Sequence, residues 1–210
     1  MRMLDLFCGR FGWSKAFAER GWECVGIDLV EPPEIPAGCK WHKEDLLCVD
    51  IPLYTAWIKR NFDFGCASSP CEQFSVHGLK LFHPDPPYPH LGIALFNRTR
   101  IIFEASGIPF VMENVRPAQQ FIGRAVNHCG PFYLWGNAVP PILPQGISKG
   151  SKFGKLTREQ RKEQNEPYYM SGSRSKARLE IKAKMATIPP ELSACVADYA
   201  ERLLEMRQSA

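Results

Sequence analysis

The sequence contains no long uninterrupted apolar run, and this absence excludes a helix that crosses a bilayer. Its N-terminus lacks the basic, apolar and small-residue layout of a secretory signal peptide. None of the eight cysteines forms a Cys-x-x-Cys pair and no histidine stands at zinc-finger spacing, so we expect neither a metal site nor a disulfide scaffold. These absences predict a cytoplasmic protein with reduced cysteines and no contact with a membrane.

Over most of the chain neither sign of charge is in excess. Residues 1–143 hold 13 Lys/Arg and 14 Asp/Glu, residues 144–184 hold 11 and 4, and residues 185–210 hold 2 and 4. The basic excess of the chain, net +4, therefore lies in one segment of net +7. Such a segment fits a phosphate-binding surface, and it fits a solvated segment without a ligand equally well.

Short apolar segments alternate with helical patterns up to about residue 130. Pro189-Pro190 then begins a further helix whose apolar side chains share one face. This alternation predicts a parallel α/β sheet with ligand sites at the carboxyl ends of its strands. The expected strands are 2–7, 24–29, 62–67 and 109–112, and the expected helices are 13–20, 53–61, 91–106 and 191–206.

A glycine turn follows the first expected strand, in Leu4-Asp5-Leu6-Phe7-Cys8-Gly9-Arg10-Phe11-Gly12. Glycines let the backbone approach a ligand, and the following helix N-terminus favours an anionic group. Asp28 ends the next expected strand, where a carboxylate can bind ribose hydroxyls, and Asp45 follows a third short segment. Taken singly, either carboxylate also fits a loop or capping role.

Cys71 directly follows the expected strand 62–67, in Ser69-Pro70-Cys71. A cysteine at the carboxyl end of a central strand lies where ligands bind, and its thiolate is a strong nucleophile. A structural cysteine is the alternative. Segment 74–90 is too long and too polar for a simple connection, which favours a mobile lid and hence a functional Cys71.

Glu113 closes the expected strand 109–112, so its carboxyl group should lie at the same sheet edge as Cys71. A carboxyl group beside apolar strand ends can keep a raised pKa and carry a proton. Pairing with Arg116 is the alternative role for this carboxylate.

Three motifs stand in order along the chain: Asp5-Leu6-Phe7-x-Gly9-x-x-Gly12, then Pro70-Cys71, then Glu113-Asn114-Val115. In this order and spacing they resemble the DNA cytosine-C5 methyltransferase family. The resemblance covers residues 1–126 and, more weakly, the C-terminal helix. Three motifs in register are far more specific than any one of them.

The resemblance implies an α/β, Rossmann-like class I SAM-dependent methyltransferase fold, with a mainly parallel sheet and a small irregular basic C-terminal insertion. It implies S-adenosyl-L-methionine (SAM) as cofactor and double-stranded, cytosine-containing DNA as partner. The implied cofactor contacts are Gly9 and Gly12 at the methionine end, Phe7 at the adenine, Asp28 at the ribose, Asp45 at the adenine amino group, and Asp5 and Pro70 as further members of the set.

The implied chemistry begins with attack of a Cys71 thiolate on C6 of cytosine, which makes C5 nucleophilic toward the methyl group. Glu113 would contact N3 and the exocyclic amine and supply the proton that offsets charge on the ring. The base would be flipped out of the duplex, and segment 74–90 would close on the DNA. The implied DNA contacts are Ser69, Gln73, Asn114, Arg174 and Arg178.

The chain departs from the family pattern inside its own motifs. Phe11 stands where the family has a second glycine, so the turn must be differently shaped. Ser69 replaces the usual proline before Pro-Cys, and Glu72 replaces the usual glutamine after it, with Gln73 as a substitute one residue later.

The family's Gln-x-Arg-x-Arg motif is not evident, and its place holds Cys129-Gly130-Pro131-Phe132-Tyr133-Leu134-Trp135. Arg174 and Arg178 are the nearest substitutes, or are solvated charges. Two segments compete for the last SAM-contact motif. Gly136-Asn137-Ala138-Val139-Pro140-Pro141 matches its letters, but we favour 185–206 because the fold needs a helix packed beside the first one.

We therefore predict a SAM-binding catalytic core over 1–143, a reduced target-recognition region over 144–184, and a C-terminal helix over 185–210 that packs back on the core. So compact a chain is what we expect of a phage or mobile element, with a role in restriction-modification. The same chemistry on RNA or on a free nucleotide stays open. So does a catalytically inactive DNA-binding or regulatory relative.

Overall fold

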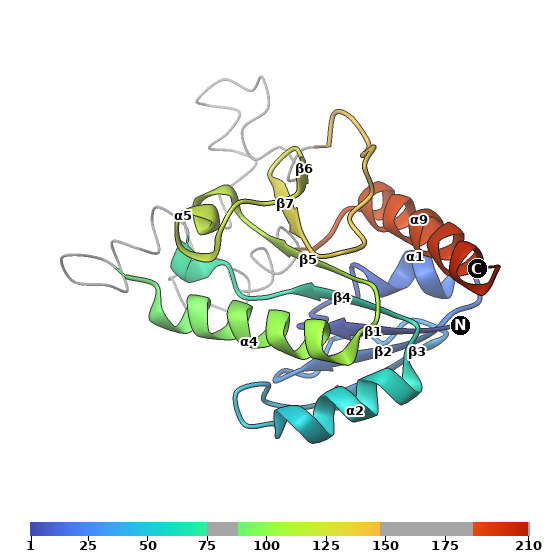
Figure 1. Ribbon diagram of the computed structural model, residues 1–210, viewed down its shortest axis with the longest axis horizontal. Helices are drawn as coiled ribbons and strands as arrows, with labels where there is room; N and C mark the ends of the chain where they lie inside the picture. Colours follow the sequence, from blue (N-terminus) through green and yellow to red (C-terminus); the bar gives the residue numbers. More distant parts are fainter. Residues whose placement is uncertain (75–87, 148–186, 210) are drawn as a thin grey trace.

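The computed structural model describes residues 1–74, 88–147 and 187–209, which form a seven-stranded sheet with helices on both faces (Figure 1). The parallel strands are β1 (Arg2–Leu6), β2 (Glu23–Asp28), β3 (Cys39–Lys43), β4 (Phe64–Ser68) and β5 (Phe110–Asn114). The strand order is β3-β2-β1-β4-β5-β7-β6. Successive strands extend to one side of β1 and then, from β4, to the other, so a ligand crevice is expected at the carboxyl ends of β1 and β4.

The sheet continues as an antiparallel hairpin, β6 (Asn127–Cys129) and β7 (Phe132–Trp135), with β7 paired to β5. The sequence did not predict these two short strands, nor β3. The β3 stretch Cys-Lys-Trp-His-Lys lies at the sheet edge and is largely solvent-facing, so it shows no apolar run. A mainly parallel Rossmann-like α/β sheet, the predicted fold class, is confirmed.

The helices cover the two faces of the sheet separately (Figure 1). One face carries α1 (Ser14–Ala18) and α9 (Pro190–Gln208), and the other carries α2 (Ile51–Asn61) and α4 (His90–Ser106). All four were predicted, but α1 is shorter than expected. Gly107 ends α4 in the left-handed conformation at φ +73°, which a glycine adopts without a steric cost.

The last helix, α9, is joined to the first by side-chain contacts. Ser193 Oγ donates to the Trp13 carbonyl at 2.5 Å, and Arg20 contacts the Asp198 carboxylate at 2.7 Å. Trp22 Nε1 donates to the Glu201 carboxylate at 3.0 Å. The C-terminal end of the described chain therefore rests on the helix that follows the glycine turn.

Two apolar layers flank the sheet. Trp13, Phe17 and Leu192 are among the buried side chains of the α1–α9 layer, and Leu4 and Phe96 belong to the α2–α4 layer. In the described part of the chain, no helix combines the length and apolar character that a bilayer span requires.

Candidate functional site

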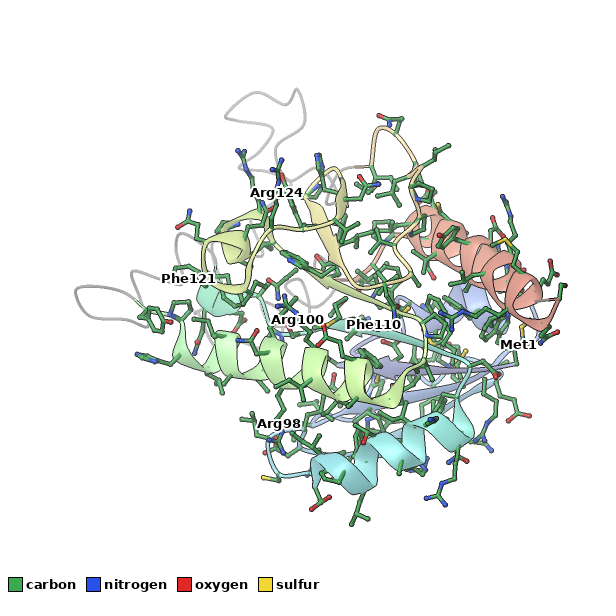
Figure 2. All side chains as sticks on the ribbon, viewed as in Figure 1. Met1, Arg98, Arg100, Phe110, Phe121 and Arg124 are labelled. Atoms are coloured by element: carbon green, nitrogen blue, oxygen red, sulfur yellow. The ribbon has the colours of Figure 1, made fainter. Side chains whose placement is uncertain are left out.

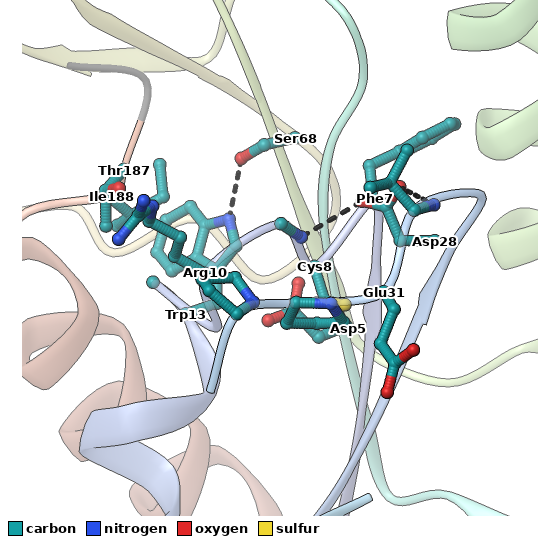
Figure 3. Close-up of a pocket in the computed structure, with 15 residues that line it drawn as sticks. Asp5, Phe7, Cys8, Arg10, Trp13, Asp28, Glu31, Ser68, Thr187 and Ile188 are labelled. Atoms are coloured by element: carbon teal, nitrogen blue, oxygen red, sulfur yellow. Dashed lines mark hydrogen bonds between the residues drawn. The ribbon is translucent and has the colours of Figure 1, made fainter. Parts of the chain in front are cut away.

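A cavity of about 310 Å³ opens at the carboxyl ends of β1 and β2 (Figure 3). Its walls come from the turn after β1, the loop after β2, the end of β4 and the two residues that precede the Pro-Pro of α9. It is lined by Asp5, Phe7, Cys8, Gly9, Arg10, Gly12, Trp13, Asp28, Val30, Glu31, Pro32, Pro33, Ser68, Thr187 and Ile188. Its volume falls in the range of small-molecule sites, about 300–1,000 Å³.

The turn after β1 bends sharply because three of its residues are left-handed. Phe7, Gly9 and Phe11 have φ of 60°, 51° and 58°. The Gly9 amide donates to the Asp28 carboxylate at 3.0 Å, and the Val30 amide donates to the other Asp28 oxygen at 3.2 Å (Figure 3). Asp28 thus ties the turn to the loop after β2 and contributes its carboxylate to the wall of the cavity.

Phe11, the first departure from the family pattern, keeps a glycine-like backbone conformation and buries its ring completely. The ring occupies the space above Gly26 of β2, where an added Cβ would lie 2.4 Å from Phe11 Cε1 and 2.7 Å from Cys8 Sγ. A glycine on the neighbouring strand therefore accommodates the phenylalanine that replaces a glycine in the turn.

At Gly12 the glycine turn meets the two residues, Thr187 and Ile188, that lead into α9. An added Cβ there would lie 2.7 Å from the Ile188 backbone nitrogen and 3.1 Å from Thr187 Cγ2. Glycine at this position lets residues 187 and 188 close the cavity against the turn.

Asp5 is the most strongly perturbed carboxyl group of the cavity. It is 1% exposed, its Oδ2 accepts a hydrogen bond from Ser14 Oγ at 2.7 Å, and its Oδ1 is buried without a hydrogen-bond partner among the described residues. Burial raises the pKa of Asp5 to about 7, the Ser14 hydrogen bonds oppose this rise, and the nearby Asp28 charge adds to it. The wall of the cavity thus contains a buried carboxyl oxygen that has no hydrogen-bond partner among the described residues.

Trp13 connects this cavity to the strand that leads to Cys71. Its Nε1 donates to Ser68 Oγ at 2.9 Å (Figure 3), and Ser68 is the last residue of β4. Cys71 follows three residues later and is half-buried.

Glu113 lies on β5, the strand that pairs with β4, and Cys71 follows the last residue of β4 by three positions. In the parallel pairing of β4 with β5, Ser68 is the register partner of Glu113, which is 6% exposed. The segment that leads to the predicted nucleophile and the strand that carries the predicted acid are therefore adjacent at one carboxyl edge of the sheet, and Ser68 at the end of β4 lines the cavity.

Ser69 and Asn114 bind each other rather than solvent. Asn114 Nδ2 donates to the Ser69 carbonyl and to Ser69 Oγ, both at 3.1 Å. Asn114 is 0% exposed and Ser69 is 4% exposed. Asn114 Oδ1 also accepts from the Val115 amide at 2.8 Å. This buried Ser69–Asn114 clasp fixes the first residue of the Ser69-Pro70-Cys71 turn. One of its two acceptors is the Ser69 hydroxyl, which the family's proline would lack.

The residues after Cys71 form η1 (Glu72–Phe74), a short 3₁₀ turn against α4. Gln73 Oε1 accepts from the Gly92 amide at 2.9 Å, and the buried Phe74 ring packs on Gly92, where an added Cβ would meet it at 3.0 Å. Glu72 is exposed and Pro70 is exposed beside the half-buried Cys71. The side-chain oxygen of Gln73 thus has a contact within the protein.

Asp45 is not among the residues that line the cavity. Its carboxylate accepts from the Leu47 amide at 2.9 Å and from Cys48 Sγ at 3.5 Å, as a loop-capping residue would. The loop is held from α4, since the Arg98 guanidinium (Figure 2) donates to the carbonyls of Leu46 and Val49.

The two candidates for the last cofactor motif lie in different places. Thr187 and Ile188 line the cavity, whereas Asn137 accepts a hydrogen bond from the Phe110 amide at 2.9 Å at the start of β5. Asn137 belongs to a second cavity of about 390 Å³, between α4 and the end of β7. Arg174, Arg178 and most of segments 74–90 and 144–184 lie outside the described residues.

Sequence reasoning missed Trp13, Ser14 and Gly26 as supports of the site. No local pattern marks them, because each acts through a partner on another element.

Residues 1–126 match the family model described as C-5 cytosine-specific DNA methylase, a match over more than half of the chain. No curated protein matches the chain. Among solved structures, the chain is similar to the antibiotic-resistance methyltransferase Kmr, with 13% identity and a TM-score of 0.30. That similarity covers 55% of this chain and 58% of the other, which is less than two thirds of its length.

Proposed function

Because the chain belongs to the C-5 cytosine-specific DNA methylase family, we propose that it transfers a methyl group from SAM to C5 of cytosine in double-stranded DNA. In this proposal the target base is flipped out of the duplex, since a stacked base cannot reach an enclosed site. Residues 1–143 act as the SAM-binding catalytic core, residues 144–184 act as the reduced target-recognition region, and residues 185–210 are the C-terminal helix that packs back on the core.

The cavity beside the glycine turn is the proposed cofactor site. Its fit to SAM is supported by Asp5 Oδ1, a buried acceptor whose hydrogen-bonding capacity the described protein leaves unused and which suits an ammonium group. Phe7, Gly9, Gly12 and Asp28 would hold the remainder of the molecule. When bound, SAM supplies an electrophilic methyl group on its sulfonium sulfur. Asp45 and Pro70 stay predicted contacts.

In the proposed mechanism the Cys71 thiolate adds to C6 of the cytosine, and a carbon–sulfur bond forms while the ring's electron pair moves toward C5. Glu113 donates a proton to N3 and so offsets the charge that develops on the ring. C5 then takes the methyl group, a base removes the C5 proton, and the thiolate leaves as the ring double bond is restored. The N3 proton returns to Glu113 in this last step, so that the product is neutral and the enzyme is regenerated.

The observation that carries this proposal is the pairing of β4 with β5. The register partner of Glu113 is Ser68, three residues before Cys71, and Ser68 Oγ accepts from Trp13 in the wall of the cavity. A nucleophile, a buried carboxyl group and a cofactor-sized cavity at one sheet edge are what this reaction requires.

Covalent trapping tests the nucleophile. DNA can be amplified with 5-fluorodeoxycytidine triphosphate in place of deoxycytidine triphosphate. Its cytosines carry fluorine at C5 and have no C5 proton to remove, so the enzyme should remain covalently attached to them in the presence of SAM. We expect a denaturation-resistant protein–DNA adduct with the wild type and none with Cys71→Ser. Cys195→Ser, which alters another half-buried cysteine, on α9, is the matched control and should form the adduct normally.

Two results would contradict the proposal. An adduct with Cys71→Ser would assign the attack to another cysteine. Absence of any adduct with the wild type, together with an unmodified methylome in cells that express the protein, would leave a DNA-binding relative without this activity.

A further inference from the structure

A second cavity, of about 390 Å³, lies between α4 and the end of β7, and the proposed reaction does not use it. It shares no lining residue with the cavity beside the glycine turn. Phe110 in its wall begins β5, whereas Glu113 and Asn114 end that strand at the predicted active site. The second cavity is therefore a separate feature, near the amino end of β5.

Arg100 of α4 is fixed in the wall of this cavity by two contacts (Figure 2). Its Cζ lies 4.9 Å from the centroid of the Phe96 ring, and its Nη2 donates to the Ile122 carbonyl at 2.8 Å. This hydrogen bond uses one of the five N–H donors of a guanidinium group. The protein thus orients the guanidinium, and its remaining donors have no partner among the described residues.

Arg124 follows a loop that is held from both α4 and β7. The Gly123 carbonyl accepts a hydrogen bond from Trp135 Nε1 at 3.0 Å, and the preceding carbonyl accepts the bond from Arg100. Arg124 is exposed and lines the cavity (Figure 2), and its guanidinium forms no hydrogen bond or ion pair with a described residue. The cavity therefore has a second cation whose charge no described side chain balances.

Donors outnumber acceptors among the polar side chains of this cavity. Asn137 Oδ1 accepts from the Phe110 amide at 2.9 Å, which leaves the side-chain NH2 group as a donor. Among the described residues Glu104 is the one carboxylate in the wall, and it forms no ion pair with Arg100 or Arg124. Two guanidinium groups and an amide against a single carboxylate favour an anionic ligand.

The rest of the wall is apolar. Phe110, Ile122 and Trp135 are buried side chains of the α2–α4 layer that also line the cavity. The volume falls in the range of small-molecule sites, about 300–1,000 Å³, and is larger than a bare inorganic anion fills. A ligand that joins an anionic group to an apolar ring fits both parts of the wall.

We propose that this cavity binds a small organic anion, a phosphate monoester that carries a ring, through charge-assisted hydrogen bonds from Arg100 and Arg124. Guanidinium groups suit phosphate because their N–H donors match its oxygens in pairs. The ring lies against the apolar wall, and Asn137 is a further donor. The site is independent of methyl transfer, because none of its lining residues takes part in the proposed mechanism.

Phenyl phosphate, which joins a phosphate group to a flat ring, is the probe. It is titrated into the ¹⁵N-labelled full chain, and the indole N–H resonance of Trp135, identified by its loss in Trp135→Phe, is followed. We expect a saturable shift with a Kd of about 1 mM or below.

Three arginine variants locate the site. Arg124→Gln removes a charge without breaking a contact to a described residue, and it should raise Kd at least about tenfold, the loss of one charge-assisted hydrogen bond. Arg100→Gln should weaken binding by at least as much. Arg60→Gln removes an exposed arginine of α2 that also donates to a backbone carbonyl, and it should leave Kd unchanged.

Two simpler ligands separate the anionic part of the site from the apolar part. Inorganic phosphate should bind at least about fivefold more weakly than phenyl phosphate, because it has no ring to bury. Benzyl alcohol, a ring without the anion, should not shift the Trp135 resonance.

Three results would overturn the inference. They are an unshifted Trp135 resonance at about ten times the expected Kd of phenyl phosphate, an unchanged Kd in Arg124→Gln, and equal affinities for phenyl phosphate and inorganic phosphate. The 5-fluorocytosine adduct tests the proposed reaction separately, so failure of one leaves the other standing.

Discussion

Replacing Asp5 with asparagine should make the protein more stable at alkaline pH and a poorer cofactor binder. The Asp5 carboxyl group has a pKa of about 7 in the folded protein against an ordinary value of 3.8, because burial disfavours its charge. Asparagine has nearly the same shape, and its oxygen can accept the Ser14 hydroxyl bond that Asp5 Oδ2 accepts now. Asp5→Asn therefore removes the ionisation and keeps the packing.

The sign and size of the effect follow from proton linkage. Between pH 3.8 and about 7 the folded state keeps the Asp5 proton that the unfolded state releases, so the free energy of unfolding falls as pH rises. The stabilisation that the folded protein gains by keeping this proton is complete below pH 3.8 and is lost above about pH 7. A shift of about three pKa units corresponds to about 4 kcal/mol as an upper bound. We expect Asp5→Asn to exceed the wild type by about 2–3 kcal/mol at pH 8 and to match it near pH 4.

Urea unfolding followed by tryptophan fluorescence, at pH 4, 6 and 8, measures this difference. Glu19→Gln removes an exposed carboxyl group at the other end of α1 and is the matched control, with no expected change in the pH profile. Cofactor affinity should move the opposite way. Loss of a charge-assisted hydrogen bond should weaken SAM binding by about 10- to 100-fold in titration calorimetry. If the free energy of unfolding depends on pH in the same way for Asp5→Asn and the wild type, burial does not raise the pKa of Asp5.

Two further predictions concern the contacts that assemble the site. Gly12→Ala would place a methyl group 2.7 Å from the Ile188 nitrogen. We therefore expect the free energy of unfolding, measured by thermal unfolding, to fall by about 1–3 kcal/mol and SAM binding to weaken. An unchanged Tm would show that residues 187 and 188 do not pack on the turn. Ser69→Ala removes one hydrogen bond of the Ser69–Asn114 clasp, and Asn114→Ala removes both. Adduct formation on 5-fluorocytosine DNA should therefore be slower with Ser69→Ala and slowest with Asn114→Ala, while SAM affinity stays constant. A wild-type rate for Asn114→Ala would contradict a positioning role.

The central strands and their connections were predictable because their apolar runs are local. The expected strands 2–7 and 24–29 correspond to β1 and β2, and the helix 91–106 corresponds to α4 with its terminating Gly107. The edge elements were not predictable. β3 is largely exposed, and β6 and β7 are three and four residues long, so neither carries a periodic signal that rises above its surroundings.

The sequence by itself determined the family and the order of the site's parts. Motifs that contain Asp5, Cys71 and Glu113 sit at strand ends, and parallel strands bring their carboxyl ends to one edge whatever the details of packing. The sequence is therefore sufficient to propose the chemistry before any contact is known.

Only the tertiary structure decided which distant residues complete that edge. It brought Ile188 against Gly12, buried Ser69 on Asn114, and gave the Phe11 ring its space over Gly26. It also placed Asn137, whose segment matches the letters of the last SAM-contact motif, in a hydrogen bond with the Phe110 amide at the start of β5. Such pairings depend on close packing between elements far apart in the chain, and neither periodicity nor propensity encodes them.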